Sequence, residues 1–122
     1  MTQRPKMPLK PGEPLMSIRH DSVMVLDSGH RVAYWSPGAE ALYGWRAEEA
    51  AGQDVRRLLR SHFPVPRRAV RECLSAQGFW EGELDNTRKD GSAVRVACRL
   101  ARERKVRGRP ASILAVHEEL RV

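Results

Sequence analysis

The chain has 122 residues, with 22 Lys or Arg against 15 Asp or Glu, so its formal net charge is +7. A chain of this length predicts one domain with its own core. It has no apolar run near the roughly 20 residues that a membrane helix needs, and its start lacks the apolar core of a signal peptide. We therefore expect a soluble, cytoplasmic protein. Cys73 and Cys98 lie far apart and outside any metal-binding spacing, so they are interpreted as small buried hydrophobes.

The positive charge suggests an acidic partner, so its distribution along the chain matters. The basic residues gather in three clusters: Arg56, Arg57 and Arg60; Arg67, Arg68 and Arg71; and the arginines from 99 to 109. Two clusters have helical spacing beside an apolar face, which favours a solvated surface. No recognition-helix pattern or RNA-binding aromatic strand accompanies them. Nucleic acid is therefore not the expected partner, although a basic, nucleic-acid-associated transcriptional regulator remains the alternative.

The first half of the chain alternates strands with short helices. Residues 1–20 are predicted to be a proline-rich linker that ends in a short apolar flank, Leu15, Met16 and Ile18. Residues 22–27 form the first strand, and Asp27 and Gly29 supply the turn to a second strand at residues 31–35. In this second strand, Val32 and Tyr34 are expected to share one face.

Capping residues then predict a series of helices. Ser36 and Pro37 begin a helix that Gly44 ends, and a second short turn over residues 47–51 ends at Gly52. Asp54 can cap residues 55–60, and a longer helix covers roughly residues 66–77.

The second half of the chain is predicted to be strands. In residues 79–87, the alternation places Trp80, Gly82, Leu84 and Asn86 toward the helices. Asp90 and Gly91 predict a type I′ hairpin turn into residues 93–102. That strand presents Val94, Val96, Cys98 and Leu100 on one face, with Arg95 and Arg99 on the other. Residues 111–117 form the final strand.

Several of these segments together resemble the PAS family of sensory domains. The first-half resemblance lies in residues 27–29, 32–44 and 48–52, and the second-half resemblance in Phe79-Trp-Glu-Gly-Glu-Leu84 and Arg88-Lys-Asp-Gly-Ser92. The resemblance implies an α+β fold over residues 21–120, with a five-stranded antiparallel sheet and short helices inserted between strands 2 and 3. It also implies a non-enzymatic role in signal transduction. No nucleotide-binding glycine loop or hydrolase motif argues otherwise.

In PAS domains the inserted helices enclose a small apolar cavity against the sheet. By resemblance, the candidate pocket residues are Tyr34, Leu42, Leu58, Leu59, Phe63, Val70, Cys73, Leu74, Trp80, Leu84, Asn86, Val96, Cys98 and Leu114. From periodicity alone, the helical members of this set are ordinary core residues. Both interpretations remain open at this point.

The expected cofactor is none, with non-covalent flavin as the alternative. Flavin is suggested because Trp80 and Asn86 resemble positions in flavin-binding redox PAS domains, although Trp-x-Gly-x-Leu also occurs in PAS domains without a cofactor. The Asn-Cys-Arg-Phe motif of photoactive flavin domains is absent. Haem is disfavoured because no histidine lies in residues 66–77, and His62 is the nearest one.

The resemblance also predicts contacts. A homodimer contact at Leu15, Met16 and Ile18 and a segment that caps the sheet are equally open interpretations of the apolar flank. A surface ion pair is expected between Glu40 and Lys89 or Arg88. The expected partners are an effector domain or a separate protein, such as a histidine kinase or a transcription regulator. Whether the chain is an excised module or a stand-alone protein is not decided by the sequence.

Overall fold

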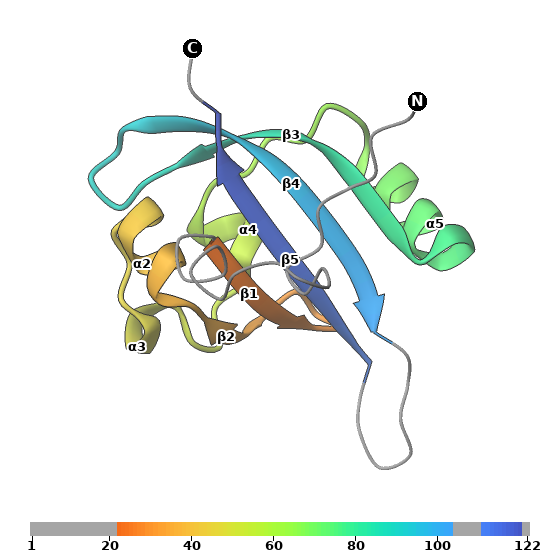
Figure 1. The fold of residues 1–122 in the computed structure, drawn as a ribbon, viewed down its shortest axis with the longest axis horizontal. Coiled ribbons are helices and arrows are strands. Elements are labelled where there is room, and N and C mark those ends of the chain that lie inside the picture. The colour runs from red at the N-terminus through yellow and green to blue at the C-terminus, as the bar shows by residue number, and fades with distance from the viewer. Residues whose placement is uncertain (1–21, 104–110, 121–122) are drawn as a thin grey trace, which may run out of the picture.

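The fold is an antiparallel sheet with its helices inserted between the second and third strands (Figure 1). It is seen in a computed structural model that describes residues 22–103 and 111–120. In this part of the chain the strand order is β2-β1-β5-β4-β3. The strands are β1 Ser22–Asp27, β2 Val32–Trp35, β3 Phe79–Thr87, β4 Ala93–Glu103 and β5 Ser112–Glu119. The helices are α2 Pro37–Tyr43, α3 Ala47–Ala50, α4 Val55–Leu58 and α5 Arg67–Gln77. This arrangement confirms the predicted fold class.

Local signals in the sequence set the helix ends. The Ser36 hydroxyl accepts a hydrogen bond from the backbone N–H of Ala39 at 3.1 Å, which caps α2. Asp54 caps α4 in the same way, accepting from the N–H of Arg56 at 3.0 Å. The helices then pack on the sheet, with α2 against β1, α3 against β2, and α5 against β3 and β4 (Figure 1). No helix among the described residues is both long and apolar enough to cross a membrane.

Both predicted hairpins form, but their turns differ from the expected types. In the first hairpin Asp27 and Gly29 lie in the turn, as predicted. Asp27 accepts from the N–H groups of Gly29 and Arg31, and the positive φ falls on His30 (65°). In the second hairpin Gly91 has a φ of 91°, and Asp90 is not among the residues with positive φ. A type I′ turn requires positive φ at both central residues, so this prediction was wrong.

A bulge reverses the expected facing of β2. Met24 pairs with Trp35 and Val25 with Tyr34, but Leu26 pairs with Val32, so Ala33 is an extra residue in the ladder. The extra residue shifts the alternation by one position. As a result Val32 and Trp35 are buried, and Tyr34 is 50% exposed. The predicted pairing of Val32 and Tyr34 on one face is therefore corrected.

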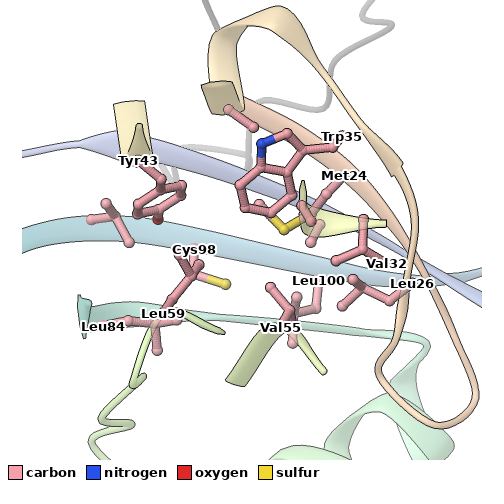
Figure 2. Packing of buried hydrophobic residues seen from close by; sticks show 14 of the residues in the cluster. Met24, Leu26, Val32, Trp35, Tyr43, Val55, Leu59, Leu84, Cys98 and Leu100 are labelled. Carbon is pink, nitrogen blue, oxygen red and sulfur yellow. The ribbon is translucent and has the colours of Figure 1, made fainter. Parts of the chain in front are cut away.

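The core lies between the helices and the inner face of the sheet (Figure 2). Met24 and Leu26 from β1, together with Cys98 and Leu100 from β4, point toward the same interior as Val55 of α4 (Figure 2). The alternation predicted for β3 and β4 is confirmed. Trp80, Leu84 and Asn86 are buried, as are Val94, Val96, Cys98 and Leu100.

The outer face of the sheet carries an apolar row that crosses all the strands. Cross-strand pairing joins, in order, Tyr34, Val25, Leu114, Ala101 and Phe79, and these residues are called the outer row below. Tyr34 and Phe79, at the two ends of the row, are 50% and 44% exposed. The described part of the chain therefore leaves large apolar side chains in solvent on this face.

Candidate functional site

The inner face of the sheet and the helices α4 and α5 enclose a cavity of about 330 Å³. Its interior is lined by apolar side chains from every layer. The sheet contributes Met24, Leu26, Leu84, Cys98, Leu100, Ile113 and Ala115, and the helices and their connection contribute Val55, Phe63, Val70 and Leu74. A volume of this size lies at the lower end of the range for small-molecule sites.

Part of the cavity lining is polar and basic. Arg56, Arg67, Arg71 and Arg102 line it together with His30 and four serines, Ser28, Ser61, Ser75 and Ser112. A second hollow of about 180 Å³ shares Arg56, Ser61, Phe63 and Arg67 with the cavity. We call the four arginines of the cavity lining, Arg56, Arg67, Arg71 and Arg102, the arginine mouth. Members of all three basic clusters, for which a solvated surface was expected, thus line one cavity.

The charges of the arginine mouth are only partly compensated. Arg56 pairs with Asp54 at 3.2 Å, and this arginine holds the pKa of the Asp54 carboxyl below its usual value even though burial opposes that shift. Burial and, after it, the positive charge of Arg56 lower the pKa of His30. Arg67 and Arg71 make no ion pair with any residue that the structure describes. No carboxylate lines the main cavity.

The other polar group of the cavity is His117 on β5, which is 5% exposed. Its Nδ1 lies 2.6 Å from the Tyr43 hydroxyl, and that hydroxyl oxygen accepts from the Asn86 amide at 2.8 Å. Burial lowers the pKa of His117 to about 4, so the ring is neutral at pH 7. Because the Tyr43 hydroxyl oxygen accepts from Asn86, we assign the Tyr43 O–H as the donor to His117 Nδ1. Nδ1 is then an acceptor without a proton, and the ring N–H lies on Nε2.

Neither cysteine has the surroundings of a reactive thiol. Burial raises the pKa of the Cys98 thiol to about 12, so it stays protonated at neutral pH. The Cys73 thiol instead donates to the Phe79 carbonyl at 3.1 Å. Both cysteines are free, and neither is placed as a reactive nucleophile.

The structure brings part of the predicted pocket set together. Phe63, Val70, Leu74, Leu84 and Cys98 line the cavity. Leu59, Trp80, Asn86 and Val96 are buried but lie outside the lining, whereas Leu42, Leu58 and Cys73 are only partly buried. Tyr34 and Leu114 lie in the outer row, because the β2 bulge and the phase of β5 direct them to the opposite face.

Sequence reasoning missed several lining residues. Met24 and Leu26 alternate within β1, and that alternation could have identified them. His117 follows Ile113 and Ala115 at two-residue spacing on β5, but the prediction chose Leu114, which has the opposite phase. The arginine mouth gives no local signal because its members come from α4, α5 and β4.

The predicted ion pair is corrected. Lys89 Nζ lies 2.7 Å from Glu49, and Arg88 pairs with Glu119 at 3.2 Å. Glu40 instead accepts a hydrogen bond from the backbone N–H of Ala47 at 2.6 Å. The Glu40 carboxylate therefore satisfies a free backbone donor in the first turn of α3. Lys89 pairs instead with Glu49, which lies on α3 itself.

The residues suggested for flavin or haem are not placed to hold either group. Neither Trp80 nor Asn86 lines the cavity, and the Asn86 amide group is engaged by Tyr43. His62 is exposed and forms an isolated bridge with Asp85, outside the cavity. Within the described residues there is no group of three or more His, Cys, Asp or Glu side chains that could hold a metal ion. The predicted contacts at Leu15, Met16 and Ile18 lie outside the described residues.

A sheet of this strand order, with helices enclosing a small cavity on one face, defines the chain as an α+β domain. The family profile described as "PAS domain" matches residues 20–120, and the chain belongs to this family. PAS domains are generally sensory and not catalytic. No curated protein matches the chain.

Solved structures with the same fold include other sensory domains. The PAS domain of a Colwellia psychrerythraea protein is 26% identical, with a TM-score of 0.70, and the match covers 83% of this chain and 86% of that one. The PAS domain of nitrogen regulation protein NR(II) from Vibrio parahaemolyticus is 16% identical, with a TM-score of 0.69 and coverage of 83% and 90%. The dark structure of the blue-light photoreceptor Aureochrome1 LOV is 17% identical, with a TM-score of 0.71 and coverage of 99% and 88%.

Proposed function

We propose that this PAS domain is a non-catalytic sensor module. Its cavity binds a small ligand, and the outer face of its sheet docks a second copy of the chain. The observation that carries the proposal is the apolar cavity of about 330 Å³ between α4, α5 and the sheet. Filling such a space with side chains would stabilise the fold, because protein interiors are normally close-packed. A cavity of this size is therefore better explained as a ligand site than as an accident of packing.

The same strand serves both faces, which supports a link between them. Ile113 and Ala115 of β5 line the cavity, and Leu114 between them belongs to the outer row. A ligand that favours one placement of β5 over another shifts the population toward that placement. Because Leu114 lies on the same strand, the outer row shifts with it. In a longer signalling pathway this change would pass to an effector, such as a histidine kinase or a transcription regulator.

Ligand binding is tested with a variant that fills the cavity. Ala115 is fully buried and lines the cavity from the central strand, so Ala115→Phe places a ring inside it. A ligand at a hundredfold its Kd stabilises the wild type by about 2.7 kcal/mol, which corresponds to a rise in Tm of roughly 10 °C. We expect a metabolite screen by thermal unfolding to find such a ligand, and Ala115→Phe to abolish its effect.

The matched control is Ala97→Phe, because Ala97 lies on the same sheet between Glu83 and Glu118 on its outer face. This control should respond to the ligand as the wild type does. A ligand that stabilises Ala115→Phe as strongly as the wild type would place binding outside the cavity. An absorption spectrum of the purified protein identifies a flavin, which would make the chain a redox sensor.

Dimerisation is tested at the centre of the outer row. Leu114→Arg introduces a charge that a dimer would have to bury against apolar groups, so we expect the dimer Kd to rise by a factor of about 100. Ala97→Arg, on the same face but among acidic neighbours, is expected to leave the Kd within a few-fold. Analytical ultracentrifugation measures both variants. A wild-type protein that stays monomeric at high concentration would contradict the proposed dimer.

A further inference from the structure

We propose that the ligand is an amphipathic organic anion: an apolar body that fills the cavity and one carboxylate or phosphate group that binds at the arginine mouth. This inference rests on the proposed function, since it names the chemical class of ligand for the same cavity. It comes from the contrast between the two parts of the cavity lining, one apolar and the other basic.

The arginine mouth carries positive charge that the described residues do not neutralise. Arg67 and Arg71 are four residues apart on α5 and both line the cavity. Like charges at this helical spacing repel each other. Arg102 adds a third positive group from the end of β4, and the lining contains no carboxylate. A bound anion would relieve this repulsion, and guanidinium groups bind carboxylate and phosphate through paired hydrogen bonds.

The length and chemistry of the interior define the rest of the ligand. Ile113, whose cross-strand partner is Arg102, and His117 both line the cavity and are four positions apart on β5, a distance of roughly 13 Å along a strand. Between these ends the walls are apolar, with Met24, Leu100 and Ala115 among them. The far end is lined by the neutral ring of His117. An ionised group there would lose its water without meeting a cation, so the body of the ligand must be uncharged.

The test compares three eight-carbon probes by isothermal titration calorimetry: octanoate, octyl phosphate and octanol. We expect at least one of the two anions to bind wild-type protein at least about tenfold more tightly than octanol, because charge-assisted hydrogen bonds exceed the contribution of a neutral hydroxyl. The preference between octanoate and octyl phosphate identifies the head group. Hexyl and decyl homologues of each probe cover ligands of different length.

Two variants on one helix make the test specific. Arg71→Gln removes a charge that lines the cavity, whereas Arg68→Gln removes one from an exposed residue outside the lining. We expect Arg71→Gln to weaken anion binding about tenfold and to leave octanol binding unchanged. Arg68→Gln should leave both within about twofold. Far-ultraviolet circular dichroism and thermal unfolding establish that each variant is folded.

The outcomes separate this inference from the proposed function. Equal binding of octanol and both anions, or equal losses in Arg68→Gln and Arg71→Gln, would overturn the anion preference while leaving a ligand site. If no probe of any length binds, the inference is also overturned. If the wider metabolite screen then finds a ligand that Ala115→Phe excludes, the proposed function still stands. If that screen finds nothing, the proposed function fails as well.

Discussion

Replacing Gly82 with alanine is expected to lower the free energy of unfolding by about 2 kcal/mol, within the range for overpacked sites. A Cβ atom at this position would lie 2.5 Å from Trp80 Cη2 and 2.6 Å from its Cζ2. The indole therefore lies directly over Gly82, and any side chain there must displace it from its contact with Phe63, whose ring centroid is 5.6 Å away. Because glycine normally weakens a strand, the same change elsewhere would stabilise the protein. Urea unfolding of wild type and Gly82→Ala measures whether the free energy of unfolding falls or rises.

A double-mutant cycle provides the control for this prediction. In a Trp80→Leu background the clash is removed, so Gly82→Ala should become neutral or slightly stabilising. The coupling would show that Trp80 and Gly82, two residues apart on one face of β3, act as a packing unit. If Gly82→Ala is already neutral in the wild-type background, the indole does not cover Gly82 in solution.

The protein is expected to lose about 3 kcal/mol of stability through His117 alone as the pH falls from 6.5 to 4, since each unit of pKa difference is worth about 1.36 kcal/mol. Burial lowers the pKa of this histidine from 6.5 to about 4 in the folded state. Between these values the unfolded chain binds a proton that the folded chain excludes, so stability falls with falling pH. Above pH 6.5 the histidine contributes no pH dependence.

The measurement is chemical unfolding at several pH values for wild type and His117→Gln. Glutamine keeps an acceptor for the Tyr43 hydroxyl but does not titrate, so the variant should have a flatter stability profile over this range. Acids such as Asp54, whose pKa is lowered, and His30 titrate in both proteins and cancel in the difference. Parallel profiles for wild type and His117→Gln would contradict a buried, neutral ring.

The fold could be predicted because its signals are local. Ser36, Pro37 and Gly44 define the start and end of α2, and the alternation in β3 and β4 assigns their faces correctly. The prediction failed at Tyr34 because a bulge depends on how β2 pairs with β1, which no pattern within β2 reveals. Asp27 was predicted to bind the turn, but which residue takes positive φ depends on the whole hairpin.

The candidate site was less predictable because its members are distant in the sequence. Val70 and Leu74 follow a helical period, so the buried face of α5 could be identified, although periodicity could not separate cavity wall from core. Placing Leu114 in the outer row would have required knowledge of the register between β5 and β1. The convergence of Arg56, Arg71 and Arg102 required the folded arrangement of three elements. In the sequence these arginines were indistinguishable from solvated charge.

Native mass spectrometry of the purified protein tests most directly whether the cavity is a ligand site. Wild type and Ala115→Phe are purified in parallel, and any small molecule released on denaturation is identified by its mass. We predict that the wild type carries or readily takes up an amphipathic organic anion. Ala115→Phe, which is expected to fold with its cavity filled by the phenyl ring, should not. Equal occupancy of both proteins, or a wild type that takes up no small molecule from any extract or probe set, would contradict the account.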